Sequence, residues 1–186
     1  MQIYRLLGVG LILLCSFGFG PAFGARVRPI DPSTLVMLSR SGPIAARLMA
    51  DLHLSRNRVA GILSNLAAES WLDPKAHELH LPWTKGGIGI AQWSGERRPD
   101  YVAFAVRLRL KPSSLEANIR FLEHELETTQ SEYLRAVKEG PDDPVAAARA
   151  FIGYENKAWL FRKLHLLDHE RYARLIAAHL DIEGGL

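Results

Sequence analysis

Cysteine is almost absent from this chain of 186 residues, and its one cysteine, Cys15, lies in a segment unlike the rest. Residues 6–19 form an apolar run without charge, Arg5 precedes this run, and the small-residue pattern Ala22-Phe23-Gly24 follows it. This layout is typical of a secretory signal peptide spanning residues 1–24. We therefore expect a mature chain of residues 25–186 that has no disulfides and is held together by its core alone.

Long hydrophobic runs are also lacking. The N-terminal run has 14 residues, fewer than the roughly 20 that span a bilayer as a helix. A retained membrane anchor is the alternative to a cleaved signal. A lipid on Cys15 is less favoured, because the large Leu14 stands where lipoprotein signals have a small residue. After cleavage we expect no stable membrane insertion and a periplasmic or secreted protein.

Charge of one sign is not concentrated anywhere, and the sequence contains no internal repeat and no low-complexity tract. The 23 basic and 20 acidic residues leave a net charge of +3, which suits an anionic outer surface but equally suits ordinary solubility.

Two short helices with a tight turn around Ser55 resemble a helix-turn-helix. Arg56 and Arg58 are a weak basic footprint, however, and export removes the chain from DNA, so we expect no nucleic-acid binding.

Helical periodicity dominates the mature chain. Pro29 and Pro32 limit any early helix to a short one, and Ser41-Gly42-Pro43 is typical of a helix start. The candidate N-caps are Ser55, the Ser113-Ser114 pair, and either Asp142 or Asp143. The pattern predicts a single, mainly α domain with helices over 44–52, 55–70, 100–108, 115–126 and 130–138, from residue 144 onward, and over 157–180.

No helical period survives between residues 71 and 96, where proline and glycine interrupt the chain repeatedly. Ile88, Ile90 and Gln92 alternate as in a short strand, so we expect a small β-hairpin here. Three of the four tryptophans, at positions 71, 83 and 93, also lie in this stretch. Indoles stack on sugars and also fill cores; three in one loop favour a carbohydrate-binding cleft for some of them.

Glu69 stands at the end of the helix predicted over 55–70. The helix dipole is negative there and the neighbouring Leu66, Trp71 and Leu72 are apolar, and both conditions raise the pKa of a carboxyl group. A general acid needs such a raised pKa, and Asn65, one turn earlier, is placed to orient Glu69. The alternative is a solvated residue at a helix end.

Histidines 53, 77, 80 and 124 raise the question of a metal. No HExxH motif and no Cys/His ligand spacing is present. We therefore expect no metal and no other cofactor.

The run GILSNLAAESWLDPKA followed by GIGIAQW resembles the phage tail lysozyme family, which is related to lytic transglycosylases. The resemblance covers roughly residues 45–160. It implies a lysozyme-like fold, with the β-hairpin beside the active-site cleft, that cleaves the β-1,4 bond between N-acetylmuramic acid and N-acetylglucosamine in peptidoglycan glycan strands. Glu69 matches the catalytic glutamate. Ser70, Gln92, Trp93 and Tyr154 match positions expected to bind substrate or, for Tyr154, to contact the catalytic glutamate.

One departure from the family pattern follows Tyr154, where Asn156-Lys157 replaces the usual proline. Glycosidases usually work with two carboxylates, and the candidates for a second are Glu78, Glu96 and Asp100. If none serves, Glu69 acts alone, with water as nucleophile in a muramidase or the muramoyl 6-hydroxyl in a lytic transglycosylase. Two other readings remain: a non-catalytic wall-binding or inhibitor-type protein on the same fold, and a purely structural secreted helical protein.

Overall fold

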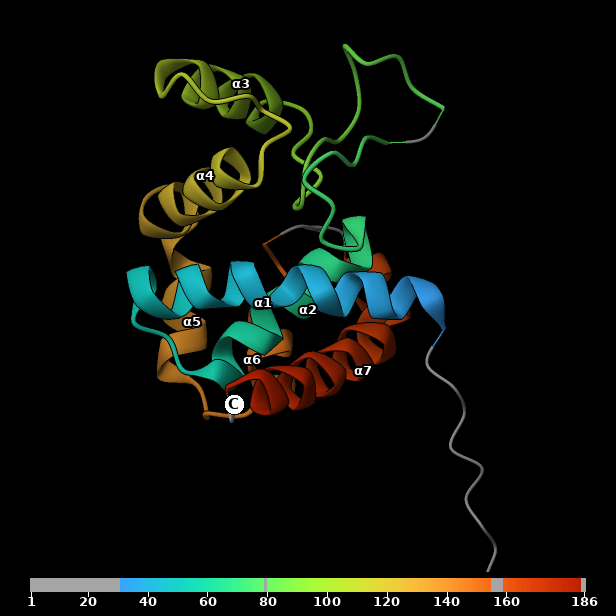
Figure 1. Ribbon diagram of the computed structural model, residues 1–186, viewed down its shortest axis with the longest axis vertical. Helices are drawn as coiled ribbons and strands as arrows, with labels where there is room; N and C mark the ends of the chain where they lie inside the picture. The colour runs from blue at the N-terminus through green and yellow to red at the C-terminus, as the bar shows by residue number, and fades with distance from the viewer. Residues whose placement is uncertain (1–30, 79, 155–158, 185–186) are drawn as a thin grey trace, which may run out of the picture.

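The computed structural model describes residues 31–78, 80–154 and 159–184, so the predicted signal peptide lies outside the described residues. The described part is mainly helical (Figure 1), with these helices: α1 (Pro32–Leu52), α2 (Arg56–Ser70), α3 (Arg97–Arg107), α4 (Leu115–Glu127), α5 (Ser131–Glu139), α6 (Pro144–Phe151) and α7 (Trp159–Glu183). None of the helices within these ranges has the length and apolar character needed to cross a bilayer.

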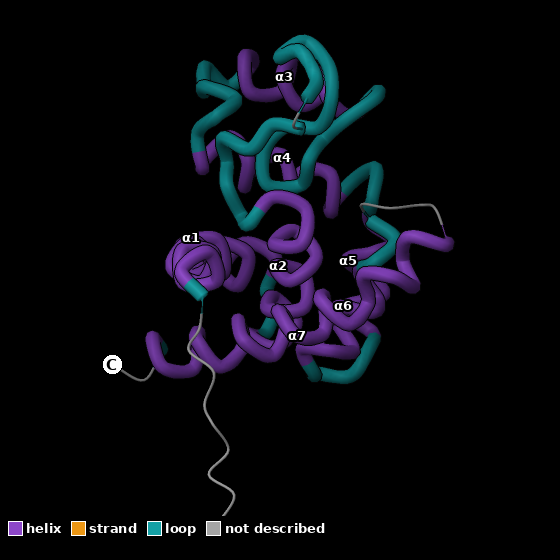
Figure 2. Tube along the Cα trace, turned by 90° about the vertical axis from the view of Figure 1, so that its right-hand side faces the viewer, coloured by secondary structure: helices purple, strands orange, loops and turns teal. Residues whose placement is uncertain are grey.

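Two groups of elements build the molecule. α2 lies among α1, α6 and α7, with α5 beside α6, while α3, α4 and the irregular segment 71–96 lie together at the other end (Figures 1 and 2). We call these groups the helical part and the upper part. Because α2 ends where segment 71–96 begins, its C-terminal turn lies between the two parts.

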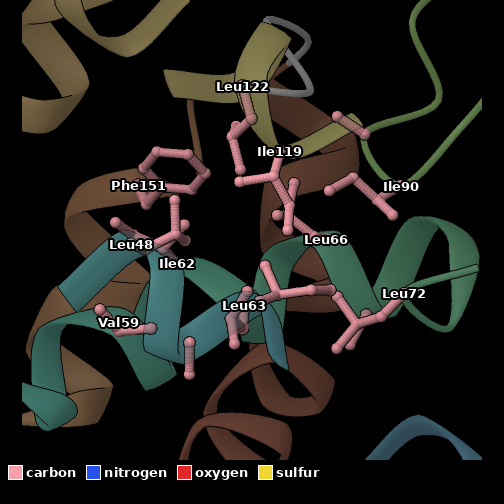
Figure 3. Close-up of a cluster of buried hydrophobic side chains, with 14 of the residues drawn as sticks. Leu48, Val59, Ile62, Leu63, Leu66, Leu72, Ile90, Ile119, Leu122 and Phe151 are labelled. Carbon is pink, nitrogen blue, oxygen red and sulfur yellow. The ribbon is translucent and has the colours of Figure 1, made fainter. Parts of the chain in front are cut away.

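The hydrophobic core is continuous across both parts. α2 is buried along most of its length, and Ile62, Leu63 and Leu66 have no exposed surface. Figure 3 shows these side chains beside Leu48 of α1, Phe151 of α6, Ile119 and Leu122 of α4, and Ile90 of the irregular segment. Burial of this shared cluster removes apolar area from water and holds the end of α2 in place.

α1 starts earlier than the sequence pattern predicts. It begins at Pro32 with Asp31 as N-cap and continues through Pro43, where a separate helix start was expected. A proline inside a helix costs about 3 kcal/mol. Met37, Ile44 and Leu48 are fully buried on both sides of this position, and that packing outweighs the lost backbone hydrogen bond.

Other helix boundaries follow the predicted capping. Ser55 caps α2, Ser114 caps α4 and Asp143 caps α6, each by accepting a backbone N–H. α3 begins after Glu96, which makes no side-chain cap, rather than at residue 100 as predicted. α7 runs unbroken to Glu183, and its expected first residues, before 159, lie outside the described residues.

The small β-hairpin predicted beside the cleft is not formed as strands. In the described part of segment 71–96, Ile88 makes two isolated antiparallel bridges, one to His77 and one to Trp93. Gly89 (φ 73°) and Gln92 (φ 46°) have left-handed backbones, which turn the chain back within five residues. A strand needs a run of extended residues, and these two positions interrupt it.

Candidate active site

Glu69 lies in the last turn of α2, on the side exposed to solvent. The next two residues, Trp71 (φ 55°) and Leu72 (φ 57°), have left-handed backbones, and the Trp71 N–H donates to the carbonyl of Ala67 at 2.9 Å. A non-glycine residue in this conformation costs about 1–2 kcal/mol, and such strain is concentrated at functional sites. The sharp helix end leaves Glu69 presented at the surface.

Two of the three apolar neighbours predicted to enclose Glu69 are turned into the core, while the third, Trp71, is 38% exposed. Leu66 and Leu72 are fully buried in the core (Figure 3), whereas Glu69 is exposed. The leucines therefore support the backbone beneath the carboxylate and do not wall it in.

Asn65 does not have the predicted role of orienting Glu69. Its buried amide nitrogen donates to the carbonyls of Gly61 at 3.0 Å and Ala148 at 3.1 Å, and its Oδ1 lies 2.7 Å from Nδ1 of His169. Both amide hydrogens are used in these contacts, so none is left to donate to a carboxylate. Asn65 joins α2 to α6 and α7 instead.

Ser70 links the end of α2 to the glycine-rich segment. Its hydroxyl is buried, 2.7 Å from the carbonyl oxygen of Ile90 and 3.0 Å from that of Leu66. The sequence comparison placed Ser70 among the substrate-binding residues. The geometry gives it a structural role: it holds segment 88–93 against the C-terminal end of α2, directly after Glu69.

Asn118, on α4, holds the same segment from the other side. Its Oδ1 accepts the N–H of Ile90 at 2.8 Å, and its amide nitrogen lies 2.8 Å from the Tyr101 hydroxyl. A Cβ on Gly89 would lie 2.4 Å from this Oδ1, so only glycine fits there. Asn118 was missed at the sequence level. The signal in the sequence was a polar residue on the helix face that also carries Leu115 and Leu122.

Gln92 and Trp93 lie at the end of this segment in different environments. Gln92 is partly exposed, and its Nε2 donates to the carbonyl of Gly89 at 3.0 Å. Trp93 has no exposed surface and packs against the rings of Tyr101 and Phe121. A fully buried indole offers no face to a sugar, so Trp93 supports the segment from behind.

Tyr154 and Trp93 come together at a residue that the prediction did not include among the site residues. The Tyr154 hydroxyl and the Trp93 Nε1 both donate to Oε2 of Glu125 at 2.6 Å. Arg97 completes the cluster through its Nε, 2.7 Å from Oε1, and its Nη2, 2.8 Å from Oε2. The contact of Tyr154 with a glutamate, which was expected at Glu69, is therefore made to Glu125.

Burial raises the pKa of the Tyr154 hydroxyl well above its usual range, and the Glu125 carboxylate raises it further, against an opposing effect of Arg97. The hydroxyl therefore stays protonated and remains a donor at every physiological pH. Glu125 lies on the α4 face that also carries Leu122 and Leu126. The signal in the sequence was a glutamate on an apolar helix face, because a buried carboxylate needs buried hydrogen-bond donors as partners.

A hollow of about 320 Å³ lies beside the end of α2, with Ser70, Trp71, Asp73 and Ala76 on one side and α1 on the other. Arg40 of α1 reaches across to this segment, bonding the Asp73 carboxylate at 3.0 Å and the Trp71 carbonyl at 3.1 Å. These bonds hold the strained turn that follows Glu69.

The candidates for a second carboxylate lie in other surroundings. Glu78 accepts the backbone N–H of Gly87 at 3.0 Å. Glu96 and Asp100 line a cavity of about 430 Å³ between α3 and α4, together with Phe104 and His124. None of these three residues lines the hollow beside Ser70.

The four histidines considered as ligands have different surroundings, and His80 is exposed with a left-handed backbone (φ 69°). His77 stacks on Trp83 and His124 on Phe104, while His53 ends α1. Within the described ranges, no three His, Cys, Asp or Glu side chains are grouped so that they would hold a metal ion.

The fold is consistent with the lysozyme-like class: it is mainly helical, with a glutamate at the exposed end of its central helix and a glycine-rich segment bonded to that end. The chain belongs to the phage tail lysozyme family, whose model matches residues 40–160. No curated protein matches it. The family indicates peptidoglycan degradation by an enzyme of the muramidase or lytic transglycosylase type.

Proposed function

We propose that the protein cleaves the β-1,4 glycosidic bond between N-acetylmuramic acid and N-acetylglucosamine, with Glu69 as general acid and then general base. The observation that carries this proposal is the position of Glu69 at the exposed end of α2, where Ser70 bonds the segment that ends in Gln92 and Trp93. All four residues fall within the family match.

In the proposed reaction, the protonated Glu69 carboxyl donates its proton to the glycosidic oxygen as the bond from C1 of the muramoyl residue breaks. Positive charge develops at C1, and the resulting carboxylate then takes a proton from the nucleophile. Water as nucleophile leaves a reducing muramoyl end. The 6-hydroxyl of the same sugar leaves a 1,6-anhydro end. Both routes need only one carboxylate and no cofactor.

The surroundings of the other acidic candidates support a single-carboxylate route. Glu78 is engaged with the backbone of its own loop, and Glu96 and Asp100 line the separate cavity between α3 and α4. Of the residues expected to touch substrate, Gln92 is partly exposed, and this exposure supports a contact between its side chain and the glycan. Trp93 and Tyr154 are both buried, so we expect them to affect substrate binding only indirectly, by holding segment 88–93 in position.

Digestion of purified peptidoglycan with residues 25–186, followed by mass spectrometry of the released muropeptides, tests this proposal. We expect Glu69→Gln to lower the rate by about 10²–10⁴-fold, the usual contribution of a general acid–base. Glu96→Gln, an exposed carboxylate substituted in the same way, is the matched control and should retain activity.

Each result has a definite meaning. Anhydro ends identify a transglycosylase, and reducing ends identify a muramidase. Activity that survives in Glu69→Gln removes Glu69 from the mechanism. A folded wild-type protein that sediments with peptidoglycan but releases nothing would replace the proposal with the non-catalytic wall-binding alternative.

We further propose that residues 1–24 direct export to the periplasm or the medium, where this substrate lies. The support is the charge and apolar pattern of that segment. The intact mass of the protein recovered from the cell envelope or medium should match a chain that begins at Ala25. A mass that matches a chain still carrying residues 1–24 would argue for the membrane-anchored alternative.

A further inference from the structure

Trp83 is the most exposed tryptophan described in the structure, with 71% of its surface accessible. It belongs to the irregular segment 71–96, part of which projects as a green loop from the upper part in Figure 1. Single exposed apolar side chains are common on protein surfaces. Trp83 is distinguished by the contacts that hold its loop and its ring in place.

The loop that carries Trp83 is held rigidly by Arg98. The Arg98 guanidinium bonds the Trp83 carbonyl, the Gly86 carbonyl at 2.7 Å and the Lys85 carbonyl at 3.2 Å. Three bonds from one planar group hold the backbone from residue 83 to residue 86. Binding residues on loops are effective when such a scaffold positions them.

His77 supports the Trp83 ring from one side. The two rings stack with centroids 4.3 Å apart and planes 29° apart, and His77 Nε2 lies 3.0 Å from the Lys85 carbonyl oxygen. One face of the indole is therefore occupied by His77. The exposed fraction of Trp83 leaves the opposite face and the edges to solvent.

Trp83 also borders a hollow of about 200 Å³. Its mainly apolar lining includes Ile88 and Val102, and the side chains of Lys75 and Arg98 add positive charge. Among the described residues, Arg98 bonds carbonyl oxygens and pairs with no carboxylate, so its charge is not neutralised. Ala76 lines both this hollow and the one beside Ser70.

We propose that Trp83, backed by His77, is a stacking platform for one sugar ring of the peptidoglycan strand, apart from the bond that Glu69 cleaves. This inference rests on the proposed function and adds a substrate-binding residue to it. A flat, rigid indole stacks on a sugar face. The basic groups at the hollow complement the carboxylates that muramoyl side chains and stem peptides carry.

Three variants of the loop provide the test. Trp83→Ala removes the platform, and Leu81→Ala removes an exposed apolar residue of the same loop, 42% accessible, without touching the ring. Because both side chains are exposed, we expect both variants to fold with unchanged melting temperatures. Trp83→Phe keeps an aromatic face and should be intermediate.

Binding is measured by sedimentation with purified peptidoglycan sacculi in the Glu69→Gln background, which separates binding from cleavage. We expect Trp83→Ala to weaken binding about tenfold, the usual effect of losing a tryptophan anchor, and Leu81→Ala to leave it unchanged. In the background with Glu69 intact, Trp83→Ala should raise KM with little change in kcat, because a platform away from the cleaved bond contributes uniform binding.

Unchanged sacculus binding and KM in Trp83→Ala would overturn the platform. An equal loss in Leu81→Ala would also overturn it, because the effect would then be general loop hydrophobicity. Loss of binding to anionic lipid vesicles in place of sacculi would assign Trp83 to a membrane surface. Binding that depends on Trp83 in a protein that cleaves nothing would retain the platform and reject the proposed catalysis, so the two failures are distinguishable.

Discussion

Glu125 is a buried residue, with 2% of its surface accessible, and its carboxylate accepts four hydrogen bonds. The donors come from Trp93, Arg97 and Tyr154, which belong to three separate segments of the chain. A buried charge is tolerated when it is paired and fully hydrogen-bonded. This one cluster therefore joins the glycine-rich segment, the start of α3 and the residue that ends the α6 region.

Glu125→Ala is predicted to destabilise the protein by about 3–5 kcal/mol, because it leaves the Arg97 charge and two buried donors without their acceptor. Urea unfolding followed by circular dichroism measures this change.

Glu116→Ala is the matched control on the same helix. Glu116 pairs with Arg47 and Arg120 at partly exposed positions, so its loss should cost no more than about 1 kcal/mol. An equal loss in the free energy of unfolding for the two variants would show that the buried Glu125 cluster stabilises the protein no more than a surface ion pair does.

At the scale of elements, α2 and α6 approach so closely that glycine is required between them. A Cβ on Gly61 would lie 2.4 Å from Cβ of Ala147 and 2.6 Å from the backbone nitrogen of Ala148. Glycine inside a helix costs up to about 1 kcal/mol relative to alanine. The close packing, together with the Asn65 bond to the Ala148 carbonyl, offsets this cost.

Gly61→Ala is predicted to destabilise the protein by about 1–3 kcal/mol, because the added methyl group forces the two backbones apart and outweighs the gain in helix propensity. Thermal unfolding gives the change. Gly95→Ala is the comparison: a Cβ there meets no atom within 4 Å, but φ is 56°, so only a conformational cost of about 1–2 kcal/mol applies. A more stable Gly61→Ala protein would contradict the close approach.

At the scale of the whole molecule, α1 of the helical part contacts α4 of the upper part through a charged cluster. Arg47 bonds Asp51 at 3.0 Å on its own helix and Glu116 at 3.1 Å on α4. Glu123 lies in the same cluster, and its Oε1 is buried without a hydrogen-bond partner in the described structure. Desolvation, followed by repulsion from Asp51, raises the pKa of Glu123 from 4.5 to about 7.

This shift makes stability depend on pH. The folded pKa lies above the unfolded one, so between about pH 4.5 and 7 the folded state binds the proton more tightly, and stability falls as pH rises through that window. Glu123→Gln, which stays neutral, should gain stability relative to wild type from pH 5 to pH 8. Urea midpoints at both pH values test this.

Glu132→Gln, at an exposed site on α5, is the control for that comparison and should show the same difference from wild type at both pH values. If the Glu123→Gln and wild-type midpoints also keep a constant difference between pH 5 and pH 8, Glu123 does not titrate in this range.

Local features were predictable from the sequence by itself. Ser55, Ser114 and Asp143 cap their helices as expected, because a cap depends on neighbours within three residues. The helical periodicity and the irregular stretch 71–96 were likewise readable, since amphipathic spacing records which residues face the core. The paired motifs around Glu69 and Gly89–Trp93 indicated the family that the comparison confirms.

Only the tertiary structure decided the rest. α1 passes through Pro43 because the core on both sides outweighs a local penalty. The hairpin is replaced by isolated bridges because Asn118 and Ser70 hold the chain from elsewhere. Trp93 and Tyr154 meet at Glu125, 32 and 29 residues away. Buried polar groups take whichever partners the fold brings to them, and that pairing is set by contacts distant in sequence.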